Sequence, residues 1–146
     1  MDSKDKLILD LIKENCRLTT QQMSKKLNIP ITTIHNRIKK MEQDGIIKGY
    51  KAILDNKKLG KPISAYILIT VDYRLLKETE TTQQELARRL RSHEFVEEAA
   101  MVTGENDIIL KVRVSDIDQL DNFVTKYLRN ISGVDKTRTI VILNEN

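Results

Sequence analysis

The sequence contains few of the residues that support special covalent or aromatic chemistry. The 146-residue chain has one cysteine, Cys16, no tryptophan and only 4% aromatic residues. A single cysteine excludes a disulfide within the chain and fits a reducing compartment, so we expect a cytoplasmic protein. Because aromatic residues are scarce, the hydrophobic cores must consist mainly of Ile, Leu and Val.

Long apolar runs and catalytic motifs are also absent from the sequence. No apolar run approaches the roughly 20 residues that a membrane-spanning helix needs, and the first residues indicate an amphipathic segment, not a signal peptide. His35 and His93 do not combine with Cys16 at a metal-ligand spacing. Neither a Gly-rich phosphate loop nor a nucleophile with its partners is recognisable. We therefore expect no membrane insertion, no metal, no cofactor and no enzymatic activity.

Charge, in contrast, is abundant and unevenly distributed. Residues 1–61 contain 14 Lys and Arg and 7 Asp and Glu, a net charge of +7, whereas residues 62–146 have a net charge of −3. A basic part joined to a mildly acidic one indicates that the first contacts a polyanion and the second has another task. We predict a helical domain over 1–48, a hinge over 49–62 that contains a short strand at 49–54, and an α+β domain over 63–146.

The basic part has the periodicity of three short helices. Apolar residues at helical spacing predict helices over about 3–15, 19–27 and 31–44. Pro30 cannot continue the second helix but suits the start of the third, and Gly45 suits the position just after it, where φ is positive. This pattern is typical of a helix–turn–helix, whose second helix lies in the major groove of DNA. The alternative is a plain helical hairpin with a solvated basic face.

The side chains expected to face DNA are polar or basic. Those near the start of the last helix can reach base edges, and those further along suit phosphates. Arg37 also has a structural interpretation, an ion pair with Asp10, Glu14 or another acid of its own domain. The predicted DNA-binding residues are Thr20, Thr32, Thr33, His35, Asn36, Arg37, Lys39 and Lys40.

The acidic part alternates between strand and helix periodicity in the order β-α-β-β-α-β. The predicted elements are strand 63–73, helix 82–92, strand 95–102, strand 107–114, helix 116–130 and strand 134–143. Two such βαβ units form a ferredoxin-like fold, in which both helices cover one face of a four-stranded antiparallel sheet. The other face would expose Tyr66, Leu68, Ile109 and Val141, which indicates self-association.

The segment 102–110 contains a turn around Gly104. Taken alone, this segment indicates an ordinary β-hairpin turn. In the functional alternative it is a ligand loop, because backbone N–H groups around Gly104 could hold a carboxylate and Asp107 could accept a hydrogen bond from an ammonium group. Both groups together would suit a free amino acid.

Residues 7–55, above all the run from Ile29 to Tyr50, resemble the DNA-binding half of the Lrp/AsnC (feast/famine) transcription regulators. The turn Gly104-x2-Asp107 resembles the amino-acid-sensing half of the same family, and the resemblance covers about residues 5–143. It implies a winged-type helix–turn–helix, a βαββαβ (RAM-type) domain and homodimers that can assemble further. One departure is Pro30, where many members have a serine.

The resemblance also implies a set of ligand-binding residues and a mode of action. An amino-acid-like effector is expected between subunits, and the dimer is expected on a roughly palindromic operator in double-stranded DNA, with recognition helices about 34–36 Å apart. Two alternatives stay open: an architectural DNA-binding protein without an effector, and a small-metabolite-binding module. The implied effector residues are Gly104, Glu105, Asn106, Asp107, Thr137 and Thr139.

Overall fold

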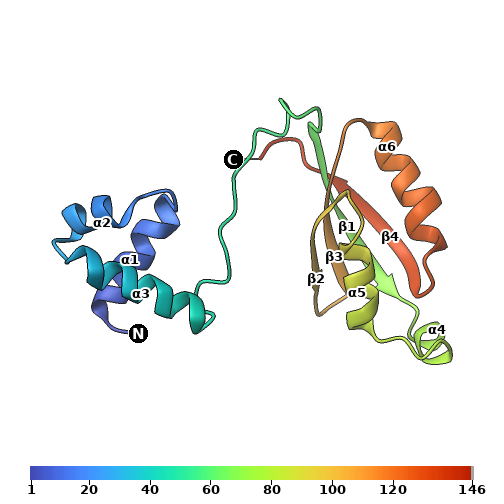
Figure 1. Ribbon diagram of the computed structural model, residues 1–146. Helices are drawn as coiled ribbons and strands as arrows, with labels where there is room; N and C mark the ends of the chain where they lie inside the picture. The colour runs from blue at the N-terminus through green and yellow to red at the C-terminus, as the bar shows by residue number, and fades with distance from the viewer. Residues whose placement is uncertain (146) are drawn as a thin grey trace. The chain divides into compact units, whose positions relative to one another are not determined.

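A computed structural model describes residues 1–145, which form two compact units (Figure 1). The first unit is Met1–Ile53, and the second begins at Leu54. The division falls inside the predicted hinge, where polar residues and Gly60 replace the apolar periodicity of the flanking segments. None of the helices in residues 1–145 is long and apolar enough to span a membrane.

The first unit consists of three helices, α1 (Ser3–Glu14), α2 (Thr20–Leu27) and α3 (Ile31–Gln43). The helix predictions are therefore confirmed to within a few residues. Apolar residues from all three helices meet in one core, where Ile8 and Ile34 are completely buried. Because this core fixes how α3 packs on α1 and α2, it also fixes which side of α3 faces solvent.

Side-chain caps begin the first two of these helices. Asp2 caps α1 in a capping box with Asp5, and Thr19 caps α2 in a capping box with Gln22. Each box satisfies two backbone N–H groups that have no partner within the helix. Gly45 has a φ of +70°, as predicted for the residue that follows α3.

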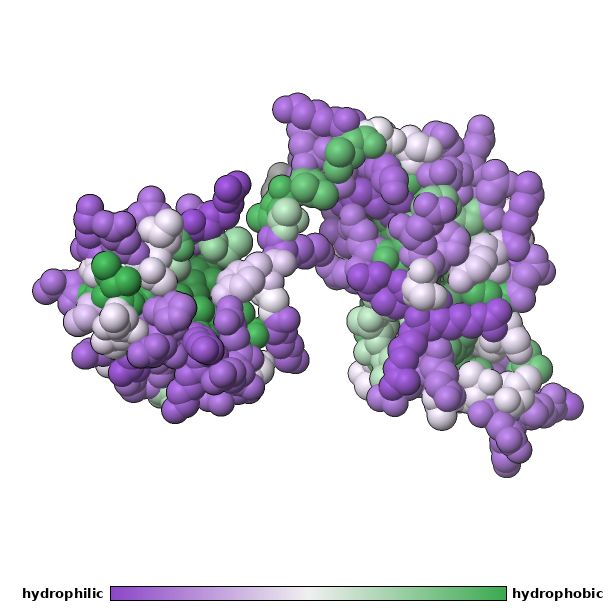
Figure 2. Space-filling model, in the orientation of Figure 1, coloured by the Kyte–Doolittle hydropathy of each residue, from purple (hydrophilic) through white to green (hydrophobic). Residues whose placement is uncertain are grey.

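The predicted strand at 49–54 is wrong for this chain. Residues 1–62 contain no strand, and Ile53 is fully exposed at 101% of its reference area. A strand requires a hydrogen-bonded neighbour, and no segment of the described chain pairs with 49–54. Figure 2 shows hydrophobic side chains on the visible face of this connecting segment.

The second unit is a four-stranded antiparallel sheet with helices on one face (Figure 1), which confirms the predicted βαββαβ order. The strand order is β2-β3-β1-β4, and one short helix, α4, was not predicted. The last predicted helix is α6 followed by a π turn and a 3-10 turn. The elements are β1 (Ile63–Val71), α4 (Tyr73–Glu78), α5 (Gln83–Arg91), β2 (Val96–Met101), β3 (Ile108–Val114), α6 (Ile117–Asn122), the π turn (Phe123–Tyr127), the 3-10 turn (Leu128–Asn130) and β4 (Val134–Val141).

The core of this unit lies between the helices and the sheet. Alternate residues of β1, such as Ile67 and Ile69, are completely buried, as are Leu110 on β3 and Leu90 on α5. Alternation of this kind is expected of a sheet that is covered on one side only. The opposite side of the sheet, which we call the open face, therefore carries the intervening residues.

The open face differs from the prediction at one position. The register pairs Tyr66 with Ile140, which places Ile140 on the open face, and pairs Ala65 with Val141, which places Val141 on the helix-covered side. An irregularity between Thr70 and Val71 offsets the alternation of β4 relative to β1, and a one-residue offset exchanges the two faces of a strand. Tyr66 and Ile140 expose 40% and 48% of their area, so the open face retains apolar surface.

Candidate nucleic-acid interface and ligand loop

The predicted DNA-binding residues of α3 lie on two adjacent stripes of the helix. The outer stripe is Thr32, His35, Asn36 and Lys39, and all four side chains are exposed. Their spacing of three and four residues places them on one side of an α-helix, opposite the inward-facing Ile34. The sequence expectation that this side of α3 points away from the core of its unit is confirmed.

The flank stripe is Thr33, Arg37 and Lys40. These residues, together with Asn36, border a hollow of about 620 Å³ that also contains Asp2 and Asp5. Thr33 and Arg37 are half-buried, whereas Lys40 is exposed. The flank stripe thus faces the acidic start of α1, and its geometry differs from that of the outer stripe.

Arg37 is held by two carboxylates. Its Nη1 donates to Oδ2 of Asp2 at 2.6 Å and to Oδ1 of Asp5 at 2.8 Å. The structure therefore favours the alternative interpretation of this side chain, an ion pair within its own domain, although the partners are not Asp10 and Glu14. A role for Arg37 at DNA stays a prediction.

The same contacts change the ionisation of the three groups. A hydrogen bond from the backbone N–H of Asp5, followed by that from Arg37, lowers the pKa of Asp2 from 3.8 to about 2. A hydrogen bond from the backbone of Asp2, and then one from Arg37, lowers the pKa of Asp5. Hydrogen bonds to Asp2 and Asp5 raise the pKa of Arg37, so all three groups are charged at neutral pH.

Two further features concern the turn between the helices. Pro30 occupies the N-cap of α3 and provides no side-chain hydrogen bond, as its lack of a hydroxyl predicts. Asn28 ends α2 with a left-handed φ of 54°, so α2 and α3 are joined by only three residues. Thr20 is the first residue of α2 and is half-buried, while the capping role belongs to Thr19.

The predicted ligand loop is a tight turn between β2 and β3. The N–H of Val102 donates to the carbonyl of Asp107 at 2.9 Å and closes the turn. Gly104 has a φ of +115°, which an L side chain rarely adopts. Gly104 and Glu105 are exposed, so the turn presents its backbone to solvent.

Asp107 is the anchor of this turn. Its Oδ2 accepts from the N–H of Val71 at 2.8 Å, its Oδ1 accepts from the hydroxyl of Tyr73 at 2.7 Å, and its own N–H donates to the carbonyl of Ile69. Gln83 donates from Nε2 to the carbonyl of Asp107 at 3.0 Å. Both carboxylate oxygens thus have structural partners, which the sequence interpretation of Asp107 as an ammonium acceptor did not include.

The two threonines of β4 are not adjacent to this turn within one chain. Thr137 pairs with Ile69 and Thr139 with Ile67, so β1 separates both from β3. Tyr73 and Gln83 are the residues that surround Asp107 instead. Sequence reasoning missed them because α4 is only 6 residues long and nothing in its sequence indicates a partner 34 residues away.

Comparison with known proteins gives both units a family. A family model described as "Winged helix-turn-helix DNA-binding" matches residues 1–48, although the described residues 1–62 form no strand. A model described as "Lrp/AsnC ligand binding domain" matches residues 64–146. The two matches have the domain order that the sequence predicts.

Whole-chain relatives agree with these matches. An uncharacterized HTH-type transcriptional regulator of Pyrococcus furiosus is 38% identical over 141 residues, which cover 97% of this chain and 91% of the relative. The leucine-responsive regulatory protein of Haemophilus influenzae is 29% identical over 145 residues, which cover 99% of this chain and 85% of the relative. The relatives are transcriptional regulators and not enzymes.

Solved structures show the same architecture over nearly the whole chain. A transcriptional regulator of Neisseria meningitidis in complex with L-Met has a TM-score of 0.89 and 26% identity, over 99% of this chain and 91% of that one. AsnC of Escherichia coli has a TM-score of 0.83 and 28% identity, over 99% of this chain and 93% of that one. The helix–turn–helix unit, the sheet domain and these likenesses together show that this chain belongs to the Lrp/AsnC family of transcriptional regulators.

Proposed function

We propose that the protein is a sequence-specific DNA-binding regulator that works in the cytoplasm and inserts α3 into the major groove. The observation that carries this proposal is the outer stripe. Its four exposed polar side chains are presented by a helix whose other side is fixed in a core by Ile34 and Met41. Asn36 can bond a base edge in two places, and Thr32 can donate or accept. Lys39 lies further along α3 and suits a phosphate.

The flank stripe contributes differently in this proposal. Lys40 is exposed and free to approach phosphates, whereas Arg37 is paired with Asp2 and Asp5. A guanidinium engaged by two carboxylates must exchange those contacts before it can neutralise a phosphate. Lys39 and Lys40 therefore supply more of the salt-dependent affinity than Arg37.

The proposal includes a homodimer, formed through the open face of the sheet, that can assemble further. Tyr66 and Ile140 form neighbouring exposed apolar surface on β1 and β4. Exposed apolar patches of this kind are typical of association surfaces. Two copies of α3 related by a twofold axis would suit a roughly palindromic operator with half-sites about one helical turn apart.

The proposed regulatory ligand is an amino acid bound between subunits near the turn 103–107. The exposed backbone around Gly104 suits a carboxylate, and the Neisseria meningitidis relative is described in complex with L-Met. Asp107 holds the turn in place and retains spare lone pairs for an ammonium group. Thr137 and Thr139 would take part only if the ligand contacts β4, of this chain or of a second copy.

The experiment that tests the proposal is selection of genomic fragments by the purified protein, with and without a panel of amino acids. We expect an enriched, roughly palindromic motif and at least one amino acid that changes occupancy. Titration of a selected fragment against competitor DNA then measures the specificity ratio. A ratio near one at physiological salt would favour an architectural role, and no DNA binding would favour a metabolite-binding module.

A further inference from the structure

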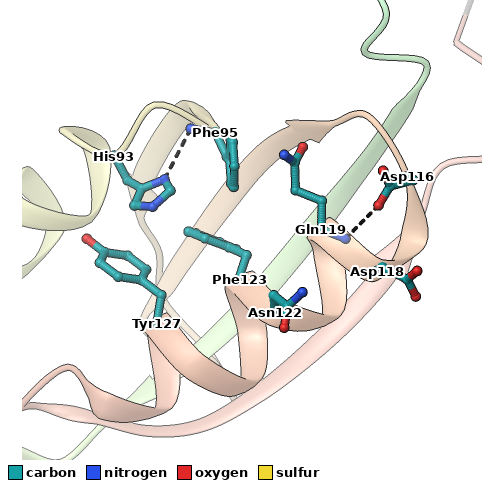
Figure 3. Close-up of a pocket in the computed structure, with 8 residues that line it drawn as sticks. All are labelled: His93, Phe95, Asp116, Asp118, Gln119, Asn122, Phe123 and Tyr127. Atoms are coloured by element: carbon teal, nitrogen blue, oxygen red, sulfur yellow. Dashed lines mark hydrogen bonds between the residues drawn. The ribbon is translucent and has the colours of Figure 1, made fainter.

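A hollow lined by aromatic rings lies on the helix-covered side of the second unit (Figure 3). Its residues precede β2 or follow β3, whereas the turn at Gly104 joins the other ends of these two strands. Its volume is about 450 Å³, within the range of small-molecule sites. His93, Phe95, Phe123 and Tyr127 form its apolar part, and Asp116 and Asp118 lie at its other end. We call it the aromatic pocket.

The aromatic pocket concentrates residues that are rare in this chain. Both phenylalanines of the sequence and one of its four tyrosines line it. The ring of His93 lies 4.7 Å from that of Phe123 and 4.3 Å from that of Tyr127, and Phe123 stacks on Tyr127 at 5.3 Å. The core elsewhere is aliphatic, so this cluster is not a general feature of the packing.

The backbone beneath the rings is also unusual. Phe123–Tyr127 is a π turn inserted after α6. Single π turns within helices are rare and occur frequently at functional sites. This turn carries Phe123 and Tyr127, the two rings that stack beside His93.

The charge of the aromatic pocket is negative. Among the described residues that line it, none is Lys or Arg. Asp116 caps α6 and accepts from the N–H of Gln119 at 2.7 Å, and these contacts lower the pKa of Asp116. Burial lowers the pKa of His93, whose Nδ1 accepts from the N–H of Phe95, so the imidazole adds no positive charge at neutral pH.

Two polar side chains that line the aromatic pocket are available for hydrogen bonds to a ligand. Within residues 1–145, the carboxylate of Asp118 and the side-chain amide of Asn122 make no hydrogen bond or ion pair. Figure 3 shows Asp118 at the end of the pocket away from His93 and Tyr127, and Asn122 beside Phe123. Apolar rings therefore line one part of the pocket, and polar side chains without a hydrogen-bond partner in the described chain line the rest.

We propose that the aromatic pocket binds a small organic cation, an amine with an aromatic or branched apolar body and no carboxylate. The apolar body lies in the hollow against the packed rings of His93, Phe95 and Tyr127. The ammonium group meets Asp118 and the amide oxygen of Asn122. Aromatic faces also attract cations. A free amino acid fits poorly, because its carboxylate would meet two carboxylates and no cation. This site is separate from the proposed amino-acid site and does not depend on it.

The test compares three probes that share one ring: phenethylamine, phenylalanine and 3-phenylpropanoate. The full-length protein is labelled with ¹³C at phenylalanine, and because both phenylalanines line the aromatic pocket, their ring signals report on this site alone. We expect phenethylamine to shift both ring signals saturably and at several-fold lower concentration than either other probe. Equal shifts from all three probes, or none from any, would overturn the proposal.

A matched pair of variants tests the role of the carboxylate. Asp118→Asn and Asp121→Asn each remove one negative charge from α6, but only Asp118 lines the pocket. We expect Asp118→Asn to weaken phenethylamine binding by about three- to fivefold, typical of an exposed charge pair, and Asp121→Asn to leave it unchanged. Equal effects of the two variants, or no effect of Asp118→Asn, would contradict a specific ammonium site.

Discussion

Nη1 of Arg37 on α3 lies 2.6 Å from Oδ2 of Asp2, the residue that caps α1. Asp5 adds a second contact at 2.8 Å, so one guanidinium joins the start of α1 to the middle of the proposed recognition helix. The acid pair that caps α1 is thus also the partner of Arg37. This arrangement links the orientation of α3 to the ionisation of two carboxylates.

Replacing Arg37 by Ala is expected to lower the melting temperature as well as any DNA affinity. Asp2 and Asp5 would keep their capping hydrogen bonds but would lose the cation between them. Thermal unfolding of Arg37→Ala, compared with Lys39→Ala on the exposed outer stripe, measures this. We expect Lys39→Ala to leave the melting temperature unchanged and to weaken DNA binding. An unchanged melting temperature for Arg37→Ala would favour a direct DNA contact instead.

Acid is expected to weaken the contact between the C-terminal segment and the open face. Hydrogen bonds from Lys111 and then Arg113 lower the pKa of Glu145 from 4.5 to about 2. Because the folded-state pKa is the lower one, this contribution to stability is complete above about pH 4.5 and is lost as the pH falls towards 2. Carboxyl-carbon NMR titration should give a Glu145 pKa near 2. A value near 4.5 would show that Glu145 is not held by these cations.

Asp107 is expected to matter for stability even without a ligand. Asp107→Ala removes the acceptor of Val71 N–H and of the Tyr73 hydroxyl, and hydrogen bonds to a charged group are each worth about 1.5–3 kcal/mol. Urea unfolding of the ligand-free protein should show a loss of this order. Glu105→Ala, at an exposed neighbouring position, should change the free energy of unfolding by less than about 0.5 kcal/mol. Equal stability of the two variants would contradict the anchoring role.

Two glycines with positive φ are expected to respond differently to alanine. A Cβ at Gly104 would have no atom within 4 Å apart from its chain neighbours, so Gly104→Ala should cost only backbone strain, of order 1–3 kcal/mol. A Cβ at Gly133 would lie 2.6 Å from Cδ2 of Leu76, which must then shift within the core. Urea unfolding should therefore show a larger loss for Gly133→Ala. Equal losses of stability for the two variants would mean that Leu76 moves aside without a loss of packing energy.

Much of the fold was predictable because its signals are local. Apolar residues at spacings of three and four gave the three helices of the first unit, and alternation gave Ile67 and Ile69 as buried residues of β1. Pro30 and Gly45 marked the two ends of the third helix. Each of these features depends on residues within one or two turns of the chain, so a single sequence is sufficient.

The features that were missed depend on distant partners. The offset of β4 against β1 is set at an irregularity near Val71, so alternation alone placed Val141 on the wrong face. Asp107 forms hydrogen bonds with Tyr73 and Gln83, which are 34 and 24 residues away in the sequence. The unpaired segment 49–54 shows the converse, because a strand was predicted where the described chain offers no neighbour.

The central claim is that the outer stripe of α3 reads base sequence, and the specificity ratio of Asn36→Ala tests it most directly. Affinity for a selected operator and for competitor DNA should be measured at one fixed salt concentration for the wild type, Asn36→Ala and Lys13→Ala, a control on exposed α1 surface. A good base contact is worth about 1–3 kcal/mol. We therefore predict that Asn36→Ala loses roughly 5- to 150-fold in specificity ratio, with nonspecific affinity and the control unchanged. An unaltered ratio for Asn36→Ala, with parallel losses on both DNAs, would contradict sequence reading by this stripe.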